Sequence, residues 1–451
     1  YQGELRFWLH GNVLVDFLPF LRRYQPGFAF GFFFVFCSFV WRIFSVENKR
    51  DSIIAAILAG VTFSILVFSY FYLWTAAAAW LFIVAAVFFF LDLGSRARIA
   101  FGMPIIGIFA IASLIPYFYL LGQRSPDMDS VQLLSSTRTP DLASPSLIIG
   151  LLFALGFVYL IRSGKAALNI PAAATGLAFA LTPLILFNQQ IFTRRSLQPV
   201  HYEIFISNYI VLLSAVIFAS FVINVSRIEG QRPRFRKGLM YVGILAAGWG
   251  FIEAVGSTGR SSAVAFIRDE SIGAIRSAHA DMLSQPDSGG AKTMLATNFV
   301  TSDFIPTVST LRPLWNPHTS SAGGVSVGEN KRLFYSYLYF SGFSEQDLAE
   351  ALRVKSFEVT AAIFGSERAL PALGGSSKSI SPHEIKAEVE AFRKYAITLA
   401  AAQAFDPEIS YLMVPTKAEP SYANLDKWYQ RDEGRECGLF KLYKLTKRSD
   451  N

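Results

Sequence analysis

One run of the sequence limits the fold more than any other: residues 52–91 contain no Asp, Glu, Lys or Arg. As a single α-helix rising 1.5 Å per residue, this run would be about 60 Å long, twice the roughly 30 Å hydrocarbon core of a bilayer. It must therefore turn back. Tyr70, Tyr72 and Trp74 mark the turn, because Tyr and Trp favour the membrane interface. The run predicts a chain that crosses a membrane more than once.

Apolar segments of this kind recur before residue 257, where the shortage of charged residues is concentrated. Charged residues make up 16% of the chain, against about 25% in ordinary globular proteins. Eight segments approach the roughly 20 apolar residues that a spanning helix needs: 26–44, 52–70, 74–92, 101–121, 146–162, 170–188, 205–225 and 238–256. We therefore expect an α-helical polytopic membrane protein, with a transmembrane domain at 1–256 and a soluble domain at 257–451.

The net charge of +8 is confined to the predicted transmembrane domain. Residues 1–256 contain 19 Lys and Arg against 11 Asp and Glu, whereas residues 257–451 contain 22 of each. The soluble domain therefore has no excess of basic residues to bind nucleic acid, and we predict none as a partner. Membrane lipid is the predicted partner of the first domain, and the sequence carries no indication of an oligomeric state.

Lys and Arg are distributed unevenly between alternate loops. Twelve lie in one set of loops: Arg42, Lys49, Arg50, Arg96, Arg98, Arg162, Lys165, Arg227, Arg232, Arg234, Arg236 and Lys237. The other set holds only Arg124, Arg138, Arg194 and Arg195. Because basic loops stay in the cytoplasm, loops 122–145 and 189–204 and the soluble domain are predicted to lie outside. The expected location is a bacterial inner (cytoplasmic) membrane.

The soluble domain has the pattern of an α/β fold. Residues 263–283 alternate apolar and charged residues at helical spacing, and 292–297, 409–414 and 438–445 resemble strands. Ser344 and Ser381 each precede an acidic residue three positions later, which is a helix-start signature. Residues 374–381, rich in Gly and Ser, are expected to form a flexible loop.

The loop at 188–203 is the first candidate functional site. Arg offers a planar fork of donors that matches phosphate, and His and Glu can move protons near neutral pH. A site here could hold a lipid-linked phosphate while the lipid tail stays in the membrane. The alternative is a polar connector whose arginines lie among lipid headgroups. The residues in question are Asn188, Gln189, Gln190, Arg194, Arg195, Gln198, His201, Tyr202 and Glu203.

A second candidate is the segment 298–332, which we interpret as a long loop after a strand. Ligands of open α/β sheets bind at such places. Its candidate residues are Asp303, Trp315, His318, Glu329 and Arg332. The alternative is an ordinary loop with one buried Trp. Glu253, near the outer end of the last span, indicates either a polar cavity or a side chain reaching the interface.

Several chemistries leave no trace in the sequence. Neither a Walker-type phosphate loop, nor a dinucleotide fingerprint, nor zinc-ligand spacing is present. The five His are scattered, so no metal site is predicted, although a divalent metal is compatible with the chemistry considered below. Cys37 and Cys437 are not expected to pair. Ion-coupled transporters usually carry ionisable residues at the membrane midplane, which these spans lack.

Taken together, these segments resemble GT-C-type membrane glycosyltransferases. The loop 188–203 is similar to a motif of one bacterial group, Asn-Gln-Gln-x-x-Thr-Gly-Arg-x-x-Gln-Pro-x-His-Tyr-Glu, with Arg194 in place of the group's Gly. Residues 69–75, 139–142 and 438–443 are also similar to that group. Because Arg tolerates positive φ poorly, this departure puts the conformation of the turn in question.

The resemblance implies transfer of a sugar from a polyprenyl-phosphate donor to an extracytoplasmic glycan, lipid or protein. No cofactor is identified; the lipid-linked sugar would be the donor substrate. Such enzymes carry a catalytic acid in the first outer loop, and we expect this chain, which begins without Met, to be a fragment lacking that loop. No catalytic residue is assigned; His201 and Glu203 are the candidates, and Asp16, the only nearby acid in an apolar context, is not chosen. The alternative is a non-enzymatic membrane protein, either a transporter of lipid-linked glycans or a scaffold.

Overall fold

The structure, a computed structural model, divides the chain into two compact units. The helical unit contains residues 1–122 and 135–259, and the C-terminal unit contains 123–134 and 260–451. Each is described by itself. The residues that the structure describes are 24–91, 95–124, 137–164, 170–197, 199–228, 232–285, 291–321, 324–354, 356–369, 380–417 and 420–448.

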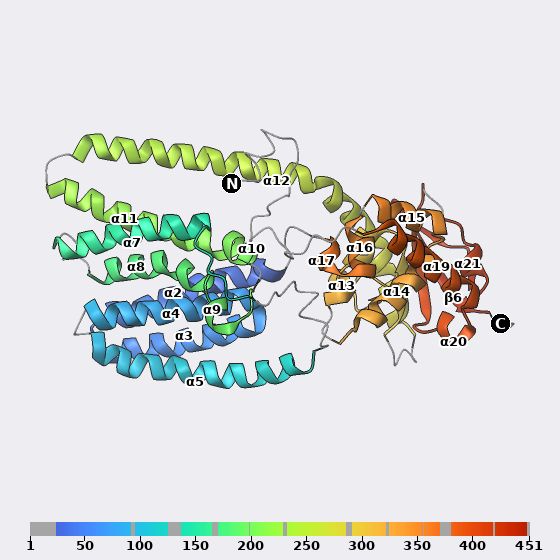
Figure 1. Cartoon of the computed structure of the whole chain (residues 1–451), viewed down its shortest axis with the longest axis horizontal. Coiled ribbons are helices and arrows are strands. Elements are labelled where there is room, and N and C mark those ends of the chain that lie inside the picture. Colours follow the sequence, from blue (N-terminus) through green and yellow to red (C-terminus); the bar gives the residue numbers. More distant parts are fainter. Residues whose placement is uncertain are drawn as a thin grey trace. The chain divides into compact units, whose positions relative to one another are not determined.

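The helical unit consists of long apolar helices (Figure 1). They are α2 (Tyr24–Ser45), α3 (Lys49–Ser69), α4 (Phe71–Leu91), α5 (Ser95–Gly122), α7 (Pro145–Arg162), α8 (Ile170–Leu186) and α11 (Asn208–Ile228). Within the described residues, seven helical segments are long and apolar enough to cross a membrane: Gly27–Ser45, Lys49–Ser69, Phe71–Leu91, Arg96–Gly122, Pro145–Arg162, Ile170–Thr193 and Glu203–Ile223. They coincide with the first seven predicted spans, which are thereby confirmed as apolar helices of spanning length.

The turn predicted inside the uncharged run is also confirmed. Helix α3 ends at Ser69 and α4 begins at Phe71, so the break falls on Tyr70, whose backbone is extended. The eighth predicted span, 238–256, lies in a different setting. It belongs to α12 (Arg232–Leu283), a single helix that also includes the amphipathic stretch 263–283. The two were expected to be separate helices, but residues 257–262 contain only one Gly and no Pro to end the first.

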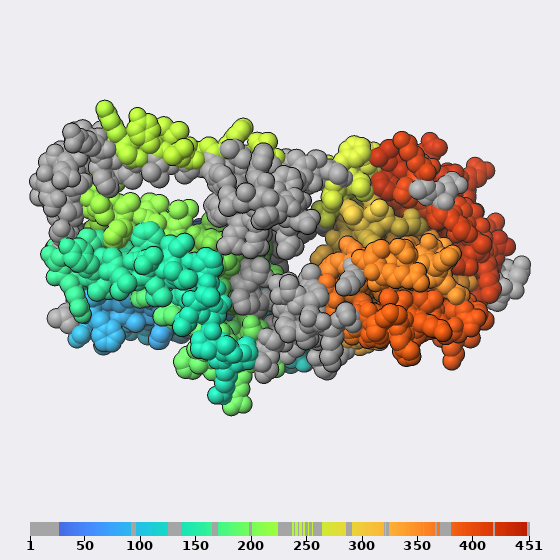
Figure 2. All heavy atoms as spheres, turned by 45° about the horizontal axis from the view of Figure 1, so that its top comes forward, coloured from blue at the N-terminus to red at the C-terminus, as the bar shows by residue number. Residues whose placement is uncertain are grey.

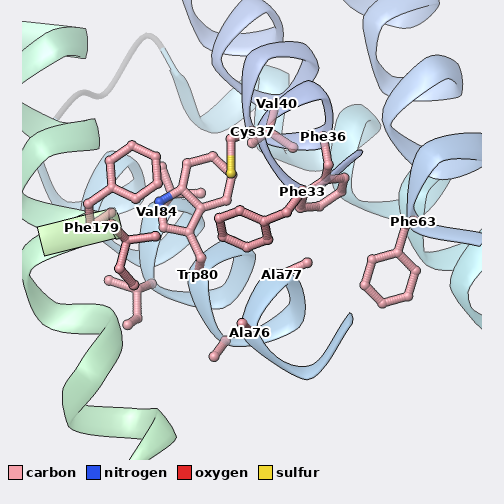
Figure 3. Packing of buried hydrophobic residues seen from close by; sticks show 14 of the residues in the cluster. Phe33, Phe36, Cys37, Val40, Phe63, Ala76, Ala77, Trp80, Val84 and Phe179 are labelled. Atoms are coloured by element: carbon pink, nitrogen blue, oxygen red, sulfur yellow. The ribbon is translucent and has the colours of Figure 1, made fainter. Parts of the chain in front are cut away.

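The interior of the helical unit is packed with aromatic rings and small residues. The indole of Trp80 on α4 stacks on Phe179 of α8, with ring centroids 5.0 Å apart, and Figure 3 shows it beside Phe33 and Cys37. Gly150 of α7 faces α8 so closely that a Cβ there would lie 2.5 Å from the carbonyl oxygen of Ala180. Small residues at such contacts allow membrane helices to approach closely.

The outer surface of the helical unit is apolar as well. On α7, the side chains of Leu152, Leu155 and Tyr159 are 64%, 69% and 62% exposed. Figure 2 shows this helix, in teal, at the surface of the unit. An apolar surface of this extent on isolated helices in water would be a liability, whereas lipid covers it without cost. The helical unit therefore has the composition of a multi-pass membrane domain.

The C-terminal unit is built on a mixed sheet with strand order β2-β1-β3-β6-β4, in which β5 also pairs with β6. Strand β1 pairs in parallel with β2 and β3. Strand β6 pairs antiparallel with β3, β4 and β5. The strand bounds are β1 Thr293–Ala296, β2 Arg312–Pro313, β3 Ile409–Pro415, β4 Tyr429–Arg431, β5 Arg435–Cys437 and β6 Phe440–Lys447. The predicted strands at 292–297, 409–414 and 438–445 correspond to β1, β3 and β6 and are confirmed.

Helices cover both faces of this sheet. Along β3, Leu412 and Val414 join one apolar core, which contains Trp315 and helix α14. The alternate residues, Tyr411 and Met413, join a second core formed with the C-terminal part of α12. This alternation follows from the two-residue period of a strand. The α/β prediction for the C-terminal unit is confirmed.

The helices of the C-terminal unit correct one prediction and confirm two. They are α13 (Phe299–Val308), η3 (Thr319–Ser321), α14 (Val327–Phe340), α15 (Glu345–Arg353), α16 (Phe357–Phe364), α17 (Ser366–Ala369), α19 (Pro382–Thr398), α20 (Ala401–Ala404) and α21 (Ala423–Asp426). The predicted long loop at 298–332 is wrong, since it contains α13, β2, η3 and the start of α14. The starts predicted at Ser344 and Ser381 are confirmed as capping boxes. Most of the Gly/Ser loop, 374–379, lies outside the described residues.

Candidate functional site

The connection between α8 and α11 folds into short helical pieces. After α8 come α9 (Gln190–Thr193), α10 (Pro199–Tyr202) and η2 (Glu203–Ser207), a turn of π-helix that leads into α11. Single π turns in helices are rare and occur frequently at functional sites. The predicted site at 188–203 is therefore an ordered connector, and its side chains have defined partners.

Two amide side chains fasten this connector to the segment 137–144. The amide of Asn188 makes a reciprocal pair with the backbone of Asp141: its Oδ1 accepts from the Asp141 N–H, and its Nδ2 donates to the Asp141 carbonyl, both at 3.0 Å. The Nε2 of Gln190 donates to the carbonyl of Thr139 at 3.0 Å. Both side chains are buried, at 9% and 6% exposure. Through these hydrogen bonds to backbone atoms, the two amides join the connector to the segment 137–144.

The turn that follows α9 carries the two arginines. Gln189 donates from Nε2 to the carbonyl of Arg195 at 2.9 Å, and the Thr193 hydroxyl donates to Gln189 Oε1 at 2.7 Å. Arg194 ends α9 in the left-handed conformation, with a φ of 61°. Elsewhere in the described residues, positive φ is confined to Gly. The position at which Arg194 replaces the Gly of the similar motif is therefore one that favours glycine.

Both arginine side chains project from the surface of the unit. Arg194 and Arg195 are exposed, and Arg194 has no ion-pair partner among the described residues. Their neighbour Phe192 is 88% exposed. Two arginines and an exposed phenylalanine therefore fall between positions 192 and 195.

His201 and Tyr202 contact the start of α4. The imidazole of His201 stacks on the ring of Tyr72, with centroids 4.6 Å apart and planes inclined by 7°. The Tyr202 hydroxyl is 2.9 Å from Thr75 Oγ1, and Tyr202 is almost completely buried. The connector is therefore fixed to α4 as well as to the loop before α7.

Glu203 lies at the N-terminus of α7. Its carboxylate accepts hydrogen bonds from the backbone N–H of Ser146, at 3.3 Å, and from the Ser146 hydroxyl, at 2.5 Å. The carboxylate of Asp141 lies at the same helix end and accepts from the Ser144 hydroxyl at 2.9 Å. Negative charge is favourable there because of the unpaired N–H groups and the helix dipole. Sequence reasoning missed Ser146, because only the fold brings it into contact with Glu203, 57 positions away, and it also missed the local bond between Ser144 and Asp141.

The segments that carry the resemblance in the helical unit are thus in contact with one another. Residues 69–75 meet 188–203 through Tyr72 and Thr75, and residues 139–142 meet it through Asn188 and Gln190. No protein-family model matches this chain, and no curated protein matches it. The fourth segment, 438–443, belongs to the C-terminal unit, where it forms the turn before β6 and the first half of that strand.

For the remaining candidates of the helical unit, the structure describes no side chain. Asp16 and Gln198 are among those not described, and nothing is described of the Glu253 side chain. In the described part of the chain, no group of three or more His, Cys, Asp and Glu side chains is arranged to hold a metal ion. Cys37 and Cys437 are both free thiols.

In the C-terminal unit the structure brings two of the predicted residues together. The Nδ1 of His318 lies 2.5 Å from Asp303 Oδ1, with His318 exposed and Asp303 largely buried. Trp315 is a core residue whose Nε1 donates to Asn330 at 3.0 Å, as the alternative of a buried Trp predicted. Arg332 donates two hydrogen bonds to Glu329, which hold the pKa of that carboxyl below its usual range.

Proposed function

We propose that this chain belongs to a GT-C-like glycosyltransferase that binds a polyprenyl-phosphate sugar at the connector 188–203, on the extracytoplasmic side of a bacterial cytoplasmic membrane. The observation that supports the proposal is the meeting of segments 69–75, 139–142 and 188–203 at one end of the helical unit. Each was singled out for its similarity to the same group of enzymes. Their joint packing around one connector is what a shared substrate site would require.

The arginines are the groups that would contact the donor phosphate. The side-chain amides of Asn188, Gln189 and Gln190 all donate hydrogen bonds to backbone carbonyls. Their role is then to hold the turn in shape rather than to bind the ligand. Arg195 and Arg194, exposed on that turn, keep guanidinium groups at the surface. A charge-assisted contact of this kind contributes about 1.5–3 kcal/mol.

The position of these arginines also fits a lipid-linked ligand. They belong to a loop on the side of the membrane that is poor in Lys and Arg, so they require a local reason. The exposed ring of Phe192, next to them in sequence, offers apolar surface for the first units of a polyprenyl tail. A phosphate between two guanidinium groups and a lipid chain along Phe192 satisfies both features.

His201 and Glu203 have positioning roles in this proposal. The His201 ring is held flat against Tyr72, and Glu203 is engaged by Ser146. Groups held in this way orient a donor or acceptor hydroxyl, and the first proton transfer is assigned to neither. Transfer would break the bond between the sugar's anomeric carbon and the donor phosphate, which leaves as polyprenyl phosphate, and form a bond to the oxygen of an acceptor hydroxyl, whose proton passes to a base that is assigned to neither residue.

The test is binding of undecaprenyl phosphate to the full chain in nanodiscs, with undecaprenol, which lacks the phosphate, as the reference ligand. Arg195→Ala should weaken phosphate-dependent binding roughly ten- to hundredfold. Arg195→Lys restores the charge but not the fork, so it should recover only part of the loss. Arg162→Ala, at the opposite end of α7, is the matched control and should bind like the wild type.

Equal affinities of the wild type and both Arg195 variants would overturn the proposal. The connector would then be an interface anchor, and the chain a scaffold or a transporter. Anchoring predicts that the Arg195 variants change expression or insertion and leave ligand affinity unaltered.

A further inference from the structure

The C-terminal unit contains a polar groove that none of the predicted site residues lines. It lies between the last turns of α12 and strands β3, β5 and β6, and its volume is about 460 Å³. This volume is within the range of roughly 300–1,000 Å³ that small-molecule sites occupy. The groove is lined by Ser277, Ala278, Ala280, Asp281, Ser284, Tyr411, Asp432, Arg435, Leu442 and Lys444.

One wall of the groove is organised around Asp281. Its Oδ2 accepts a hydrogen bond from the Tyr411 hydroxyl at 2.7 Å and another from Gln285 Nε2 at 3.0 Å. The ammonium group of Lys444 lies 3.0 Å from the same oxygen. The Oδ2 of Asp281 therefore accepts from several donors at once and orients the Tyr411 hydroxyl and the Lys444 ammonium group toward it.

Next to this cluster, Asp432 and Arg435 keep hydrogen-bonding groups available for a ligand; Arg435 lies on β5, which pairs with β6. Asp432 accepts from the backbone N–H groups of Gly434 and Lys444 through one oxygen, Oδ1. The side chain of Arg435 is exposed and has no ion-pair partner among the residues that the structure describes. The guanidinium of Arg435 and the second oxygen of Asp432 therefore provide donors and an acceptor on neighbouring positions.

The charges in the groove select the kind of ligand. Two acids, Asp281 and Asp432, face two bases, Arg435 and Lys444, so the lining has no net charge. A phosphate or nucleic acid would need an excess of positive charge, which is absent here. A hydroxyl group both donates and accepts, so a polyhydroxylated ligand can use acids, bases and serines together. Beneath the polar groups, Ala278, Tyr411 and Leu442 belong to the apolar core, so the groove offers a ligand mainly its polar side chains and the exposed Ala280.

We infer that this groove binds a neutral oligosaccharide. As a binding site it stands on its own lining, whereas its role as the acceptor site rests on the glycosyltransferase function proposed above. Arg435 is the residue expected to contribute most, since its donors are uncommitted and a guanidinium spans two vicinal hydroxyls. Ala280, an exposed residue of α12, also lines the groove, and a large side chain at this position would occupy part of it.

The experiment is a glycan array probed with the full chain in nanodiscs. The array carries neutral mannan, arabinan, galactan and glucan oligosaccharides beside sulfated and phosphorylated ones. The wild type should bind one or more neutral glycans. Arg435→Ala should weaken that binding about tenfold, and Ala280→Trp, which removes no hydrogen bond, should abolish it. Arg353→Ala, an exposed arginine on α15, is the matched control, and thermal unfolding verifies that every variant is folded.

Three results would overturn the inference: no neutral glycan bound, anionic glycans bound in preference, or neutral binding unchanged in both groove variants. The two proposals fail independently. Glycan binding that survives in Arg195→Ala, in a chain that does not bind undecaprenyl phosphate, would remove the proposed donor site and keep the groove. Loss of glycan binding in the groove variants, with undecaprenyl phosphate binding intact, would support both.

Discussion

The two units place their large apolar side chains differently: many are exposed in the helical unit, whereas the C-terminal unit buries its large aromatic residues in its core. In the helical unit, large apolar side chains point outward: Phe82 of α4 and Leu155 of α7 are each 69% exposed. In the C-terminal unit, Trp315 and Phe334 are buried, and charged side chains form ion pairs at the surface, such as Arg393 with Glu390. The difference indicates that the first unit is adapted to lipid and the second to water, because in both the surface matches its surroundings.

The units also differ in how their polar groups are used. Within the helical unit, the buried amides of Asn188 and Gln190 join loops by bonding to backbone carbonyls. In the C-terminal unit, Ser344 and Ser381 cap the starts of helices, the first in an exposed setting and the second in a half-buried one. A polar group beside a lipid environment must be fully satisfied within the protein, whereas one at a wet surface can exchange partners with water.

The largest expected effect concerns the side of the membrane on which the C-terminal unit lies. The predicted orientation is wrong if this unit lies on the same side as the basic loops. Alkaline phosphatase fused after Asn451 should be active in cells, because the charge distribution of the loops predicts an extracytoplasmic C-terminal unit. A green fluorescent protein at the same position should stay dark. The effect is expected to be all or none. Fluorescence with no phosphatase activity would reverse the orientation and remove the extracytoplasmic donor site.

Removing one large side chain from each unit should sharpen the contrast. Trp315→Ala deletes a buried ring that contacts Phe334, with centroids 4.6 Å apart, and should destabilise the C-terminal unit by about 3–5 kcal/mol. Phe82→Ala removes a ring that lipid would surround and should change the helical unit by less than about 0.5 kcal/mol. Pulse proteolysis of the full chain in urea measures each unit separately. Equal losses would mean that Phe82 is covered by protein.

The local stability of the connector should depend on single side-chain amides, such as that of Asn188, more than the stability of the C-terminal unit does. Asn188→Ala leaves the N–H of Asp141 and two backbone carbonyls without their partner, at a cost of about 1–3 kcal/mol. Hydrogen exchange of the peptide around Asp141 should therefore be roughly ten- to hundredfold faster. Gln403→Ala, an exposed amide on α20, is the matched control and should have no effect. Unchanged exchange at Asp141 would show that the loop is held by other contacts.

The smallest effect is expected at the wet surface of the C-terminal unit. Hydrogen bonds from the backbone and hydroxyl of Ser381, with Arg368 nearby, lower the pKa of Glu384 to about 2. Because the folded-state pKa is depressed below 4.5, this stabilisation is complete above about pH 4.5 and is lost as the pH falls toward 2. Glu384→Gln should therefore unfold more easily than the wild type at pH 7 and nearly equally at pH 2.5. A pH-independent difference would contradict the capping role.

Hydropathy was sufficient to predict most of the helices of the helical unit. The first seven spans and the turn at Tyr70 follow from local composition alone, because a bilayer forces long apolar helices. In the C-terminal unit, Ser344 and Ser381 were recognised by a local pattern of capping. Helix α14 was missed although Ser326 caps it, because the segment 298–332 as a whole was read as a loop.

The candidate site was predictable as a segment but not as an arrangement. The residues of 188–203 were recognised by their composition, yet their partners Thr75, Asp141 and Ser146 lie 47 to 127 positions away. Local periodicity holds no information about such contacts. The structure therefore assigns the amides to holding the loop, which the sequence grouped with the arginines as ligand-binding residues.

The pairing of Asn188 and Gln190 with backbone atoms has a consequence for how such proteins can vary. The partners are the carbonyls of Asp141 and Thr139 and the N–H of Asp141, which every residue except proline provides. Substitutions at Thr139 therefore leave the hydrogen bond to its backbone carbonyl intact. Substitution of Asn188 or Gln190, in contrast, removes the hydrogen bonds that its side-chain amide makes. Among descendants of a common ancestor, the two amides should be retained while Thr139 diverges, and proline should be excluded from position 141.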